Sequence, residues 1–369
     1  MDSHSFRNIR SPEAMLLALC WLPLYLLTRP LPDASDPPFD IIWFSEYTHK
    51  IANGVSPFVI MDPYLRYIIY VIPVWVIERF RNLSINDVIW LNAQITLLLE
   101  GLAIPCVLYW VTRRWASRRA ALGSLGILAL IQTHRYIWHP GLGFVADSWY
   151  LSPHWQYAIP VIPVLLAFYF TSSTALDRYQ YTVVYAGFFL GVAAGIQVIQ
   201  ATIASIIIAA ALIWTRRWRD LGVIVGVSML VASPNILIMR QYLDKWLAMG
   251  VSRLHPDRLL ALISSPLVLA VVLCSCIAVG AVFLRGPEHV PIERVTPLSW
   301  AVVSGGVVVF CSIGGLEWYQ WQAATLFKYA VTYWAGYCLA ILWAELTGGR
   351  FDCSVKCDAT DVILNSLRI

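Results

Sequence analysis

Ionisable side chains crowd into one short stretch near the N-terminus of an otherwise apolar chain. The stretch from residue 33 to residue 66 holds five carboxylates, one histidine and two permanent cations: Asp33, Asp36, Asp40, Glu46, Asp62, His49, Lys50 and Arg66. A carboxylate can remove a proton from an attacking hydroxyl group, and a cation can stabilise a phosphate leaving group. These residue types fit a catalytic or binding loop, with a solvated loop of ordinary surface charge as the alternative.

The segment that begins at Asp40 has the pattern of a helix lying on a surface. Asp40 opens the run DIIWFSEYTHKIANG, and Asn53-Gly54 closes it with a helix-stop signal. Its apolar side chains fall near one face, so we expect an amphipathic helix at the membrane surface. A short linker follows, and then Asp62-Pro63-Tyr64 leads into an apolar run.

The order of these features resembles the first outer loop of the GT-C superfamily. An acid, an amphipathic helix, a Gly-x-x-Pro-aromatic step at Gly54–Phe58 and an aromatic-Pro stretch at Asp62-Pro63-Tyr64 follow one another. GT-C proteins are integral-membrane glycosyltransferases that use sugars carried on polyprenyl phosphate, and the chain is most similar to the polyprenol-phosphate-mannose-dependent mannosyltransferases. The likeness is firm over residues 14–115, looser to about 215 and weak beyond.

The resemblance implies that the first-loop acid is the catalytic base. That acid stands at the head of the amphipathic helix, which makes it Asp40, with Asp36 as the alternative because the upstream spacing is loose. A phosphate leaving group is already a weak base, so one carboxylate suffices, unlike the pair needed for glycoside hydrolysis. Asp40 also suits the N-cap of the helix, and a cap alone is the simpler explanation.

A second outer loop, residues 134–157, supplies further candidates. Relatives often carry an acid here, so the resemblance assigns Asp147 to acceptor positioning or cation binding, with a solvated loop residue as the alternative. His154 could lie beside the same site. The histidine spacing does not match a helical pair of ligands, so we predict no metal site and no cofactor. The resemblance leaves room for a divalent cation held by Asp40 and Asp147.

Basic residues on the same side of the membrane need an explanation, because they oppose the usual charge bias. A polyprenyl phosphate is an anion at the membrane interface, and Arg or Lys would bind its phosphate. Contact with lipid headgroups is the alternative for each of them. The candidates for donor binding are Arg66, Arg240, Lys245, Arg253 and Arg258.

Composition indicates a polytopic membrane protein. The 369 residues are 59% hydrophobic and 13% charged, whereas soluble domains carry about 25% charged residues. No run rich in Lys or Arg is interleaved with aromatic residues, which argues against a nucleic-acid partner. We expect about ten membrane spans, near residues 14–31, 86–112, 120–138, 158–174, 181–196, 197–215, 221–239, 259–284, 298–314 and 325–345.

The orientation depends on the run from Tyr64 to Phe80, which Pro73 interrupts. If this run is a re-entrant or interface-lying helix, most cations fall on the cytoplasmic side. Both termini are then cytoplasmic, together with the Arg113–Arg119 and Trp214–Arg219 clusters. The first outer loop then shares the extracytoplasmic side with residues 134–157, 239–259 and 314–328, the last of which ends at Lys328.

Polar residues within the apolar runs point to contacts between helices. Glu100 is an intramembrane acid and so a functional candidate by default, although Asn92 and Gln94 on the same run suggest a structural polar seam. Gln197 and Gln200 are expected to form hydrogen bonds across helices. The run they belong to is too long for one crossing, so we predict a tight helical hairpin with its bend at Gly195-Ile196-Gln197.

The expected fold is an all-α, GT-C-like membrane domain over residues 1–369. Residues 1–215 form the catalytic module, residues 216–345 add further spans and residues 346–369 are a cytoplasmic tail. The expected function is transfer of a hexose, with mannose favoured, from a polyprenyl-phosphate donor to a lipid, glycan or protein acceptor on the extracytoplasmic side. The alternatives are a transporter or flippase of lipid-linked substrates and a non-catalytic scaffold in the membrane.

Overall fold

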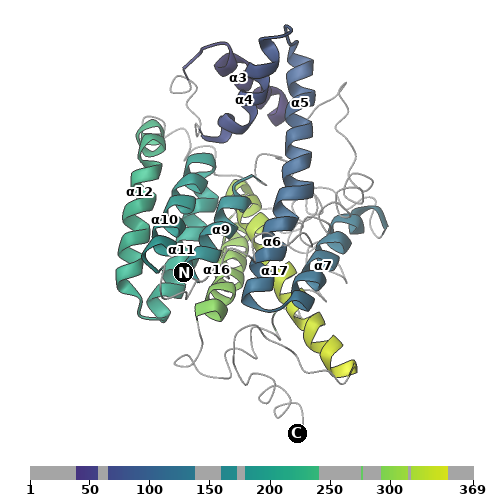
Figure 1. The fold of residues 1–369 in the computed structure, drawn as a ribbon, viewed down its shortest axis with the longest axis vertical. Helices are drawn as coiled ribbons and strands as arrows, with labels where there is room; N and C mark the ends of the chain where they lie inside the picture. The colour runs from purple at the N-terminus through teal and green to yellow at the C-terminus, as the bar shows by residue number, and fades with distance from the viewer. Residues whose placement is uncertain are drawn as a thin grey trace, which may run out of the picture.

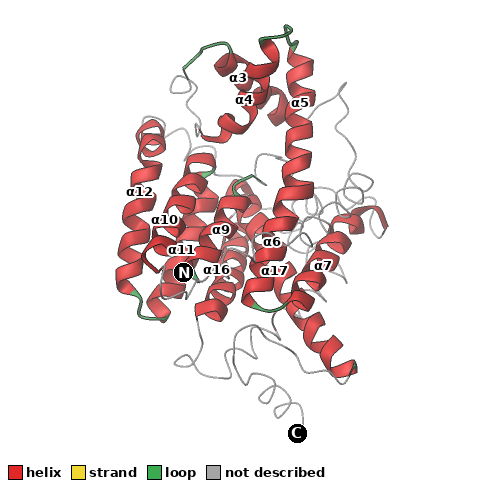
Figure 2. Ribbon diagram, viewed as in Figure 1, coloured by secondary structure: helices red, strands yellow, loops and turns green. Residues whose placement is uncertain are grey.

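The computed structural model is built from helices (Figures 1 and 2). It describes residues 39–56, 65–137, 159–172, 179–240, 276, 292–314 and 317–347, and no strand occurs among them. The helices are α3 Phe39–Ala52, α4 Leu65–Glu78, α5 Ile85–Leu98, the π-helix η2 Leu99–Ala103, α6 Ile104–Trp115, α7 Arg118–Ile137, α9 Val161–Thr171, α10 Tyr179–Ile196, α11 Val198–Trp214, α12 Trp218–Arg240, α16 Ile292–Gly314 and α17 Glu317–Leu346. The all-α prediction is confirmed for the described part of the chain.

Two parts can be distinguished in Figure 1. Helices α3, α4 and the start of α5 form a small cap unit, and helices α6 to α17 form a bundle below it. We call the end of the bundle next to this unit the cap end. The opposite end is the arginine end, because it carries the α6–α7 and α11–α12 turns with Arg113, Arg114, Arg118, Arg119, Arg216, Arg217 and Arg219. The two cation clusters predicted to share one side of the membrane therefore lie at the same end.

Contacts at the two ends fix the directions of the bundle helices. At the arginine end, the Trp115 indole N–H donates to the Ser172 hydroxyl group, and the Arg217 guanidinium donates to the Thr171 carbonyl oxygen at 3.3 Å. At the cap end, Ile159 before α9 and Ile196 at the end of α10 pack on Tyr70 of α4. Helices α6, α9 and α11 thus descend from the cap end, and α10 ascends to it.

The predicted break in the long apolar run is present. Gln197 adopts an extended conformation, with φ −152° and ψ 103°, and separates α10 from α11. Because Ile196 lies at the cap end and Arg217 at the arginine end, the two helices form the hairpin that the sequence predicted.

A single long helix joins the cap unit to the bundle. Helices α5, η2 and α6 follow one another without a turn from Ile85 to Trp115, and the Ile104 N–H donates to the Leu99 carbonyl across the wider π turn. Pro105 accounts for this turn, because a proline ring collides with the carbonyl four residues earlier in a regular α-helix. At about 1.5 Å per residue the helix is about 46 Å long, so it exceeds a hydrocarbon core of about 30 Å and extends into the cap unit.

Helix α4 does not cross the bundle. It packs between α3 and α5, and Val74 meets Leu83 and Val88 at the turn into α5. Its 14 residues would span only about 21 Å. The arrangement agrees with the expectation that the run from Tyr64 to Phe80 does not span the membrane.

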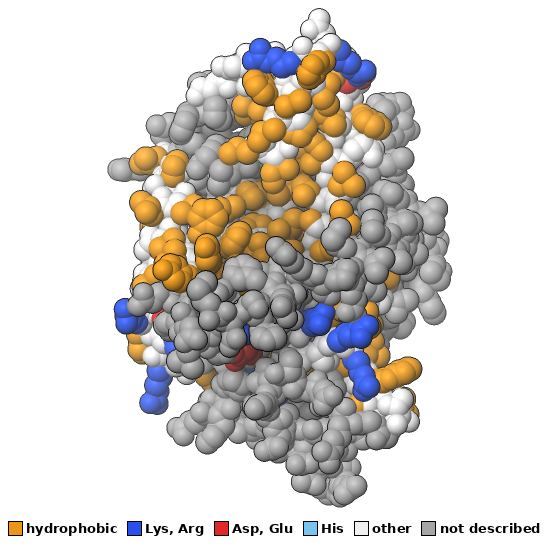
Figure 3. All heavy atoms as spheres, in the orientation of Figure 1, with side chains coloured by type: hydrophobic (Ala, Val, Ile, Leu, Met, Phe, Trp, Pro, Cys, Tyr) orange, Lys and Arg blue, Asp and Glu red, His pale blue; other side chains and the backbone are white. Residues whose placement is uncertain are grey.

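Two described helices are long and apolar enough to cross a membrane, Trp218–Leu237 and Ile292–Cys311. Shorter apolar helices accompany them, among them Val161–Thr171, Tyr181–Ile196 and Val198–Trp214. Hydrophobic side chains cover the middle of the face shown in Figure 3, and Lys and Arg side chains lie toward its two ends. Large hydrophobic side chains are exposed on several helices, among them Leu230 of α12, Phe310 of α16 and Trp343 of α17. These features indicate association with a membrane, and the count of about ten spans stays a prediction.

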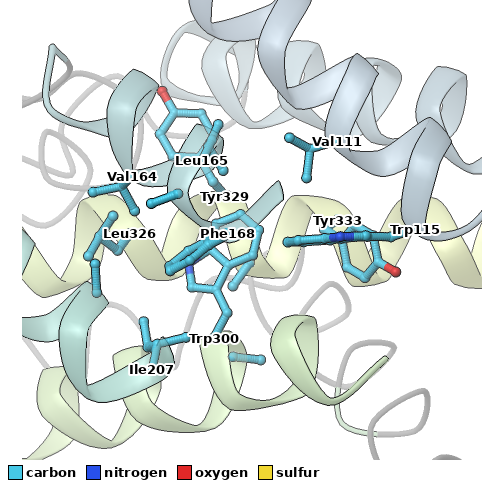
Figure 4. Packing of buried hydrophobic residues seen from close by; sticks show 14 of the residues in the cluster. Val111, Trp115, Val164, Leu165, Phe168, Ile207, Trp300, Leu326, Tyr329 and Tyr333 are labelled. Carbon is cyan, nitrogen blue, oxygen red and sulfur yellow. The ribbon is translucent and has the colours of Figure 1, made fainter. Parts of the chain in front are cut away.

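An aromatic core holds together the half of the bundle next to the arginine end (Figure 4). Trp115 of α6, Phe168 of α9 and Trp300 of α16 are buried, with ring centroids 6.4 Å apart for Trp115 and Trp300 and 5.4 Å apart for Phe168 and Trp300. Tyr333 of α17 adds an edge contact to Trp115 at 5.6 Å. The core thus joins four helices that are far apart in the sequence.

Glycines allow two helix pairs to approach closely. A Cβ atom on Gly191 of α10 would lie 2.6 Å from the Val231 Cβ atom of α12, and one on Gly336 of α17 would lie 2.6 Å from the Ala120 carbonyl oxygen of α7. Small residues that let backbones meet are typical of helix pairs in membranes. The chain therefore depends on these glycines for its tightest helix packing.

One expectation from the sequence is wrong. Lys328 was placed in an outer loop, but α17 begins at Glu317 and Lys328 is buried within it. The aromatic residues before it belong to the helix, so the helix starts about eight residues before residue 325, where the span was predicted to begin.

Candidate functional site

Three of the predicted site residues fall on described helices near the cap end. Asp40 is the second residue of α3, Arg66 is the second residue of α4 and Arg240 is the last residue of α12. Helices α3 and α4 belong to the cap unit, and α12 ends away from the arginine end of the bundle (Figure 1). The remaining candidates lie outside the described residues: Asp36, Asp147, His154, Lys245, Arg253 and Arg258.

Helix α3, which carries Asp40, is held against α5 by a buried polar contact. The Asn92 amide donates to the Ser45 hydroxyl group at 3.1 Å and to the Thr48 hydroxyl group at 3.4 Å. All three side chains are buried. Buried hydrogen bonds of this kind fix the rotation of one helix relative to another, because an unpaired polar group would be costly. Asn92 therefore orients the helix of the proposed base.

The far end of α3 is tied to the end of α4. His49 Nδ1 lies 3.0 Å from the Glu78 carboxylate, and the Asn53 amide donates to the same carboxylate at 3.4 Å. Helix α3 ends as the sequence predicted, with Gly54 at φ 91° and the Val55 N–H donating to the Lys50 carbonyl at 3.0 Å. The cap unit is thus a braced pair of helices on α5.

The turn between α4 and α5 is built around Asp87. Its carboxylate accepts hydrogen bonds from the Ser84 backbone N–H at 2.9 Å and the Ser84 hydroxyl group at 2.8 Å, and it pairs with Arg81 at 2.9 Å. The Ser84 backbone N–H, its hydroxyl group and the Arg81 charge all lower the pKa of Asp87, against an opposing effect of desolvation. The cap unit therefore begins α5 with a charged N-terminal cap.

Apolar contacts join the cap unit to the bundle. Buried Tyr70 packs with Ile159 and Ile196, and Tyr47 of α3 and Leu99 of η2 pack against this cluster. Glu100, the acid that the sequence singled out, belongs to the π turn that begins at Leu99. π turns are often found at functional sites. The junction of the cap unit and the bundle is therefore the candidate site.

Polar side chains are buried in the cap half of the bundle, below this junction. Gln197 is at the α10–α11 break, Gln200 is in the first turn of α11, and Gln322, Thr325 and Lys328 are in the first half of α17. Each is at most 5% exposed. Neither the nitrogen nor the oxygen of the Gln322 amide has a hydrogen-bond partner, although a buried amide left unpaired costs roughly 2 kcal/mol or more.

Sequence reasoning found part of this arrangement. It identified Gln197 and Gln200 as polar residues within the bundle, and it named Asn92 as one member of a polar seam. It missed Gln322 and misplaced Lys328, because the aromatic stretch before them resembles an interfacial loop. Helical spacing from Gln322 through Thr325 to Lys328, three residues each, could have shown that they continue the following span.

Three of the predicted site residues lie in the first or last turn of a described helix. Asp40 is in the first turn of α3, Arg66 is in the first turn of α4 and Arg240 ends α12. Among the described residues no group of three or more His, Cys, Asp or Glu side chains could hold a metal ion. The proposed cation between Asp40 and Asp147 is not tested, because Asp147 lies outside the described residues.

Comparisons with protein-family models, with curated proteins and with solved structures found no match for this chain. The likeness to GT-C glycosyltransferases therefore rests on the sequence motifs, and the function that it implies stays a prediction.

Proposed function

We propose that the protein is an integral-membrane glycosyltransferase that moves a hexose, with mannose favoured, from a polyprenyl-phosphate donor to an extracytoplasmic acceptor. Both termini are cytoplasmic and the arginine end faces the cytoplasm. The observation that carries the proposal is the cap unit: the described helices of the first loop, α3 and α4, are braced on α5 at the end of the bundle opposite the arginine clusters.

The reaction needs one base in this unit. The acceptor hydroxyl oxygen attacks the anomeric carbon, the bond from that carbon to the phosphate oxygen breaks, and the polyprenyl phosphate leaves as an anion. The acceptor proton passes to the carboxylate of Asp40 as positive charge grows on the attacking oxygen. Arg66 and Arg240 stabilise the departing phosphate together with the basic residues of the third outer loop. Asp147 and His154 orient the acceptor.

The test is transfer by purified protein supplied with labelled polyprenyl-phosphate sugars and a lipid and glycoprotein extract as acceptor. General-base catalysis typically contributes about 10²–10⁴-fold, so Asp40→Asn should lower transfer at least about a hundredfold with little loss of stability. Asp33→Asn is the matched control and should be nearly silent. Loss of activity with Asp36→Asn and not with Asp40→Asn would move the base by four residues. Full activity of both variants would refute a base in the first loop.

A second candidate is a transporter or flippase of lipid-linked substrates. The continuous helix α5–η2–α6 carries a π turn at Leu99–Ala103, which includes the acid Glu100, and π turns are often found at functional sites. A reconstituted assay separates the two functions. Translocation of a labelled polyprenyl-phosphate sugar across vesicles without release of the sugar supports the transporter, and sugar transfer to an acceptor supports the enzyme.

A further inference from the structure

Gln322 and Lys328 have not been given a role by the mechanism above. Both lie on α17 in the cap half of the bundle, and they are 0% and 5% exposed. Polar and charged side chains so deep in an apolar bundle are costly, and in membrane domains they mark functional sites by default.

The side chain of Gln322 specifies what kind of group would satisfy it. Its amide nitrogen has two N–H donors and its amide oxygen is an acceptor, and neither atom has a hydrogen-bond partner. A phosphate oxygen could only accept from the nitrogen. A hydroxyl group both donates and accepts, so hydroxyl groups are the ligand chemistry that would satisfy both atoms of this amide.

Lys328 specifies a different group. Its ammonium lies 4.7 Å from the centroid of the Tyr329 ring, which stabilises a cation in an apolar setting. An ammonium has three donors and no acceptor, and it binds phosphate as a point charge. A phosphate is therefore the ligand chemistry that matches this side chain.

The two side chains are placed in one order along α17. Tyr329 is seven residues after Gln322, so the two share a stripe of the helix, and the Tyr329 ring is the one that the Lys328 ammonium contacts. Helix α17 starts at the cap end, so Gln322 is nearer to the cap unit than Lys328 by about 9 Å along the axis, from six residues at about 1.5 Å each.

We propose that α17 binds the headgroup of a polyprenyl-phosphate sugar, with the Lys328 ammonium on the phosphate and the Gln322 amide on the sugar hydroxyl groups. The proposal rests on the proposed function for the identity of the lipid. The order of the two side chains places the sugar toward the cap unit, where Asp40 begins α3, and the phosphate deeper in the bundle.

Binding can be measured without any transfer reaction. Wild-type protein in phosphatidylcholine nanodiscs is titrated with decaprenol, decaprenyl phosphate and decaprenyl-phosphate mannose, with native mass spectrometry as the readout. We expect decaprenyl phosphate to bind at least about tenfold more tightly than decaprenol, since charge-assisted hydrogen bonds are the strong ones. Mannose should add a further factor of about three or more.

Two variants separate the two groups. Lys328→Met removes the charge and should abolish the preference for phosphate while keeping the gain from mannose, and Lys328→Arg should restore the preference. Gln322→Leu should remove the gain from mannose and keep the preference for phosphate. Arg219→Met, an exposed cation at the arginine end, is the control and should change neither.

The melting temperature of the Gln322→Leu variant distinguishes a binding role of Gln322 from a structural one. Gln322→Leu replaces an amide without partners by an apolar side chain, so the unliganded variant should melt at the same or a higher temperature than the wild type. A clear drop in melting temperature would show that Gln322 is part of the fold, and the proposal would fail. It would also fail if folded Lys328→Met kept the full preference for decaprenyl phosphate.

Competition in the same samples tests whether the bound phosphate group belongs to a polyprenyl phosphate, to an ordinary phospholipid or to free inorganic phosphate. Inorganic phosphate and phosphatidic acid should compete at least about tenfold more weakly than decaprenyl phosphate. Equal competition by phosphatidic acid would assign the site to an ordinary lipid headgroup and overturn the proposal. Specific binding of decaprenyl-phosphate mannose without any sugar transfer would refute the proposed enzyme and support the binding site on α17. Sugar transfer that survives both substitutions would support the enzyme and refute the binding site on α17.

Discussion

Replacing Gly336 by alanine should separate two helices of the bundle. A Cβ atom at this position would meet the Ser124 side chain, the Ser124 backbone nitrogen and, at 2.6 Å, the Ala120 carbonyl oxygen. Ordinary contact begins at 3.4 Å, so the carbonyl alone requires α7 and α17 to move apart by 3.4 − 2.6 = 0.8 Å. Two of the three atoms belong to the backbone and cannot rotate away.

The expected cost follows from two opposing effects. Overpacking of this kind costs about 1–3 kcal/mol, and the change from glycine to alanine within a helix returns about 1 kcal/mol. Because two of the three close contacts are backbone atoms, we expect overpacking toward the upper end of its range and a net loss of up to about 2 kcal/mol. The melting temperature should be lower by several degrees, measured on detergent-purified protein by fluorescence-detected size exclusion after heating.

The matched control is Gly126→Ala on the same helix pair. A Cβ atom on Gly126 of α7 would meet nothing within 4 Å, so this variant should be neutral or up to about 1 kcal/mol more stable. Adding Ser124→Ala to Gly336→Ala should not restore stability, because the backbone atoms stay in place. Equal melting temperatures for Gly336→Ala and Gly126→Ala would refute the close helix crossing.

Three further predictions concern other parts of the chain. Arg216 ends α11 with a φ of 56°, so Arg216→Gly should raise stability by about 0.5–1 kcal/mol in thermal melts, and a loss would contradict the left-handed turn. The pKa of Asp87 is lowered, so its ionised carboxylate stabilises the fold above its ordinary pKa near 3.8, and this stabilisation is lost as the pH falls through the lowered pKa. In melts taken from pH 7 to pH 2, Asp87→Asn should therefore lose less stability at low pH than the wild type. Single cysteines at Arg118 and Arg219 should react with an impermeant thiol reagent only after the cell is opened, whereas one at Val55 should react from outside, and the reverse pattern would invert the orientation.

Local signals in the sequence predicted the elements whose cause is local. The stop at Asn53-Gly54 appears as the end of α3, because glycine adopts the left-handed conformation there at little cost. The break at Gln197 was predicted from the length of the apolar run, which is too long for one membrane crossing. Each of these depends on residues within about one helix of one another.

The rest of the arrangement depends on contacts between distant segments. Asn92 reaches Ser45 across 47 positions of the sequence, and Gly336 meets Ala120 across more than two hundred. Neither pairing has a local signature, since a polar residue or a glycine within an apolar run fits several helix faces equally well. For the same reason the sequence named Asp40 and Arg66 as site residues without showing how the cap unit that carries them is braced.

Burial alone does not mark a polar residue in this bundle as functional. Thr296 and Thr332 are fully buried, but their hydroxyl groups donate to carbonyl oxygens of their own helices, at 2.9 Å and 2.7 Å. The hydrogen-bonding groups of such residues are paired within their own helix, so these residues can occupy any position along it. A buried polar side chain that makes no bond within its own helix must find its partner elsewhere. Gln322 is such a side chain, and among the buried side chains of the described residues its amide is the one for which both polar atoms lack a partner. That contrast, rather than depth in the bundle, is the physical reason to look for a ligand beside α17.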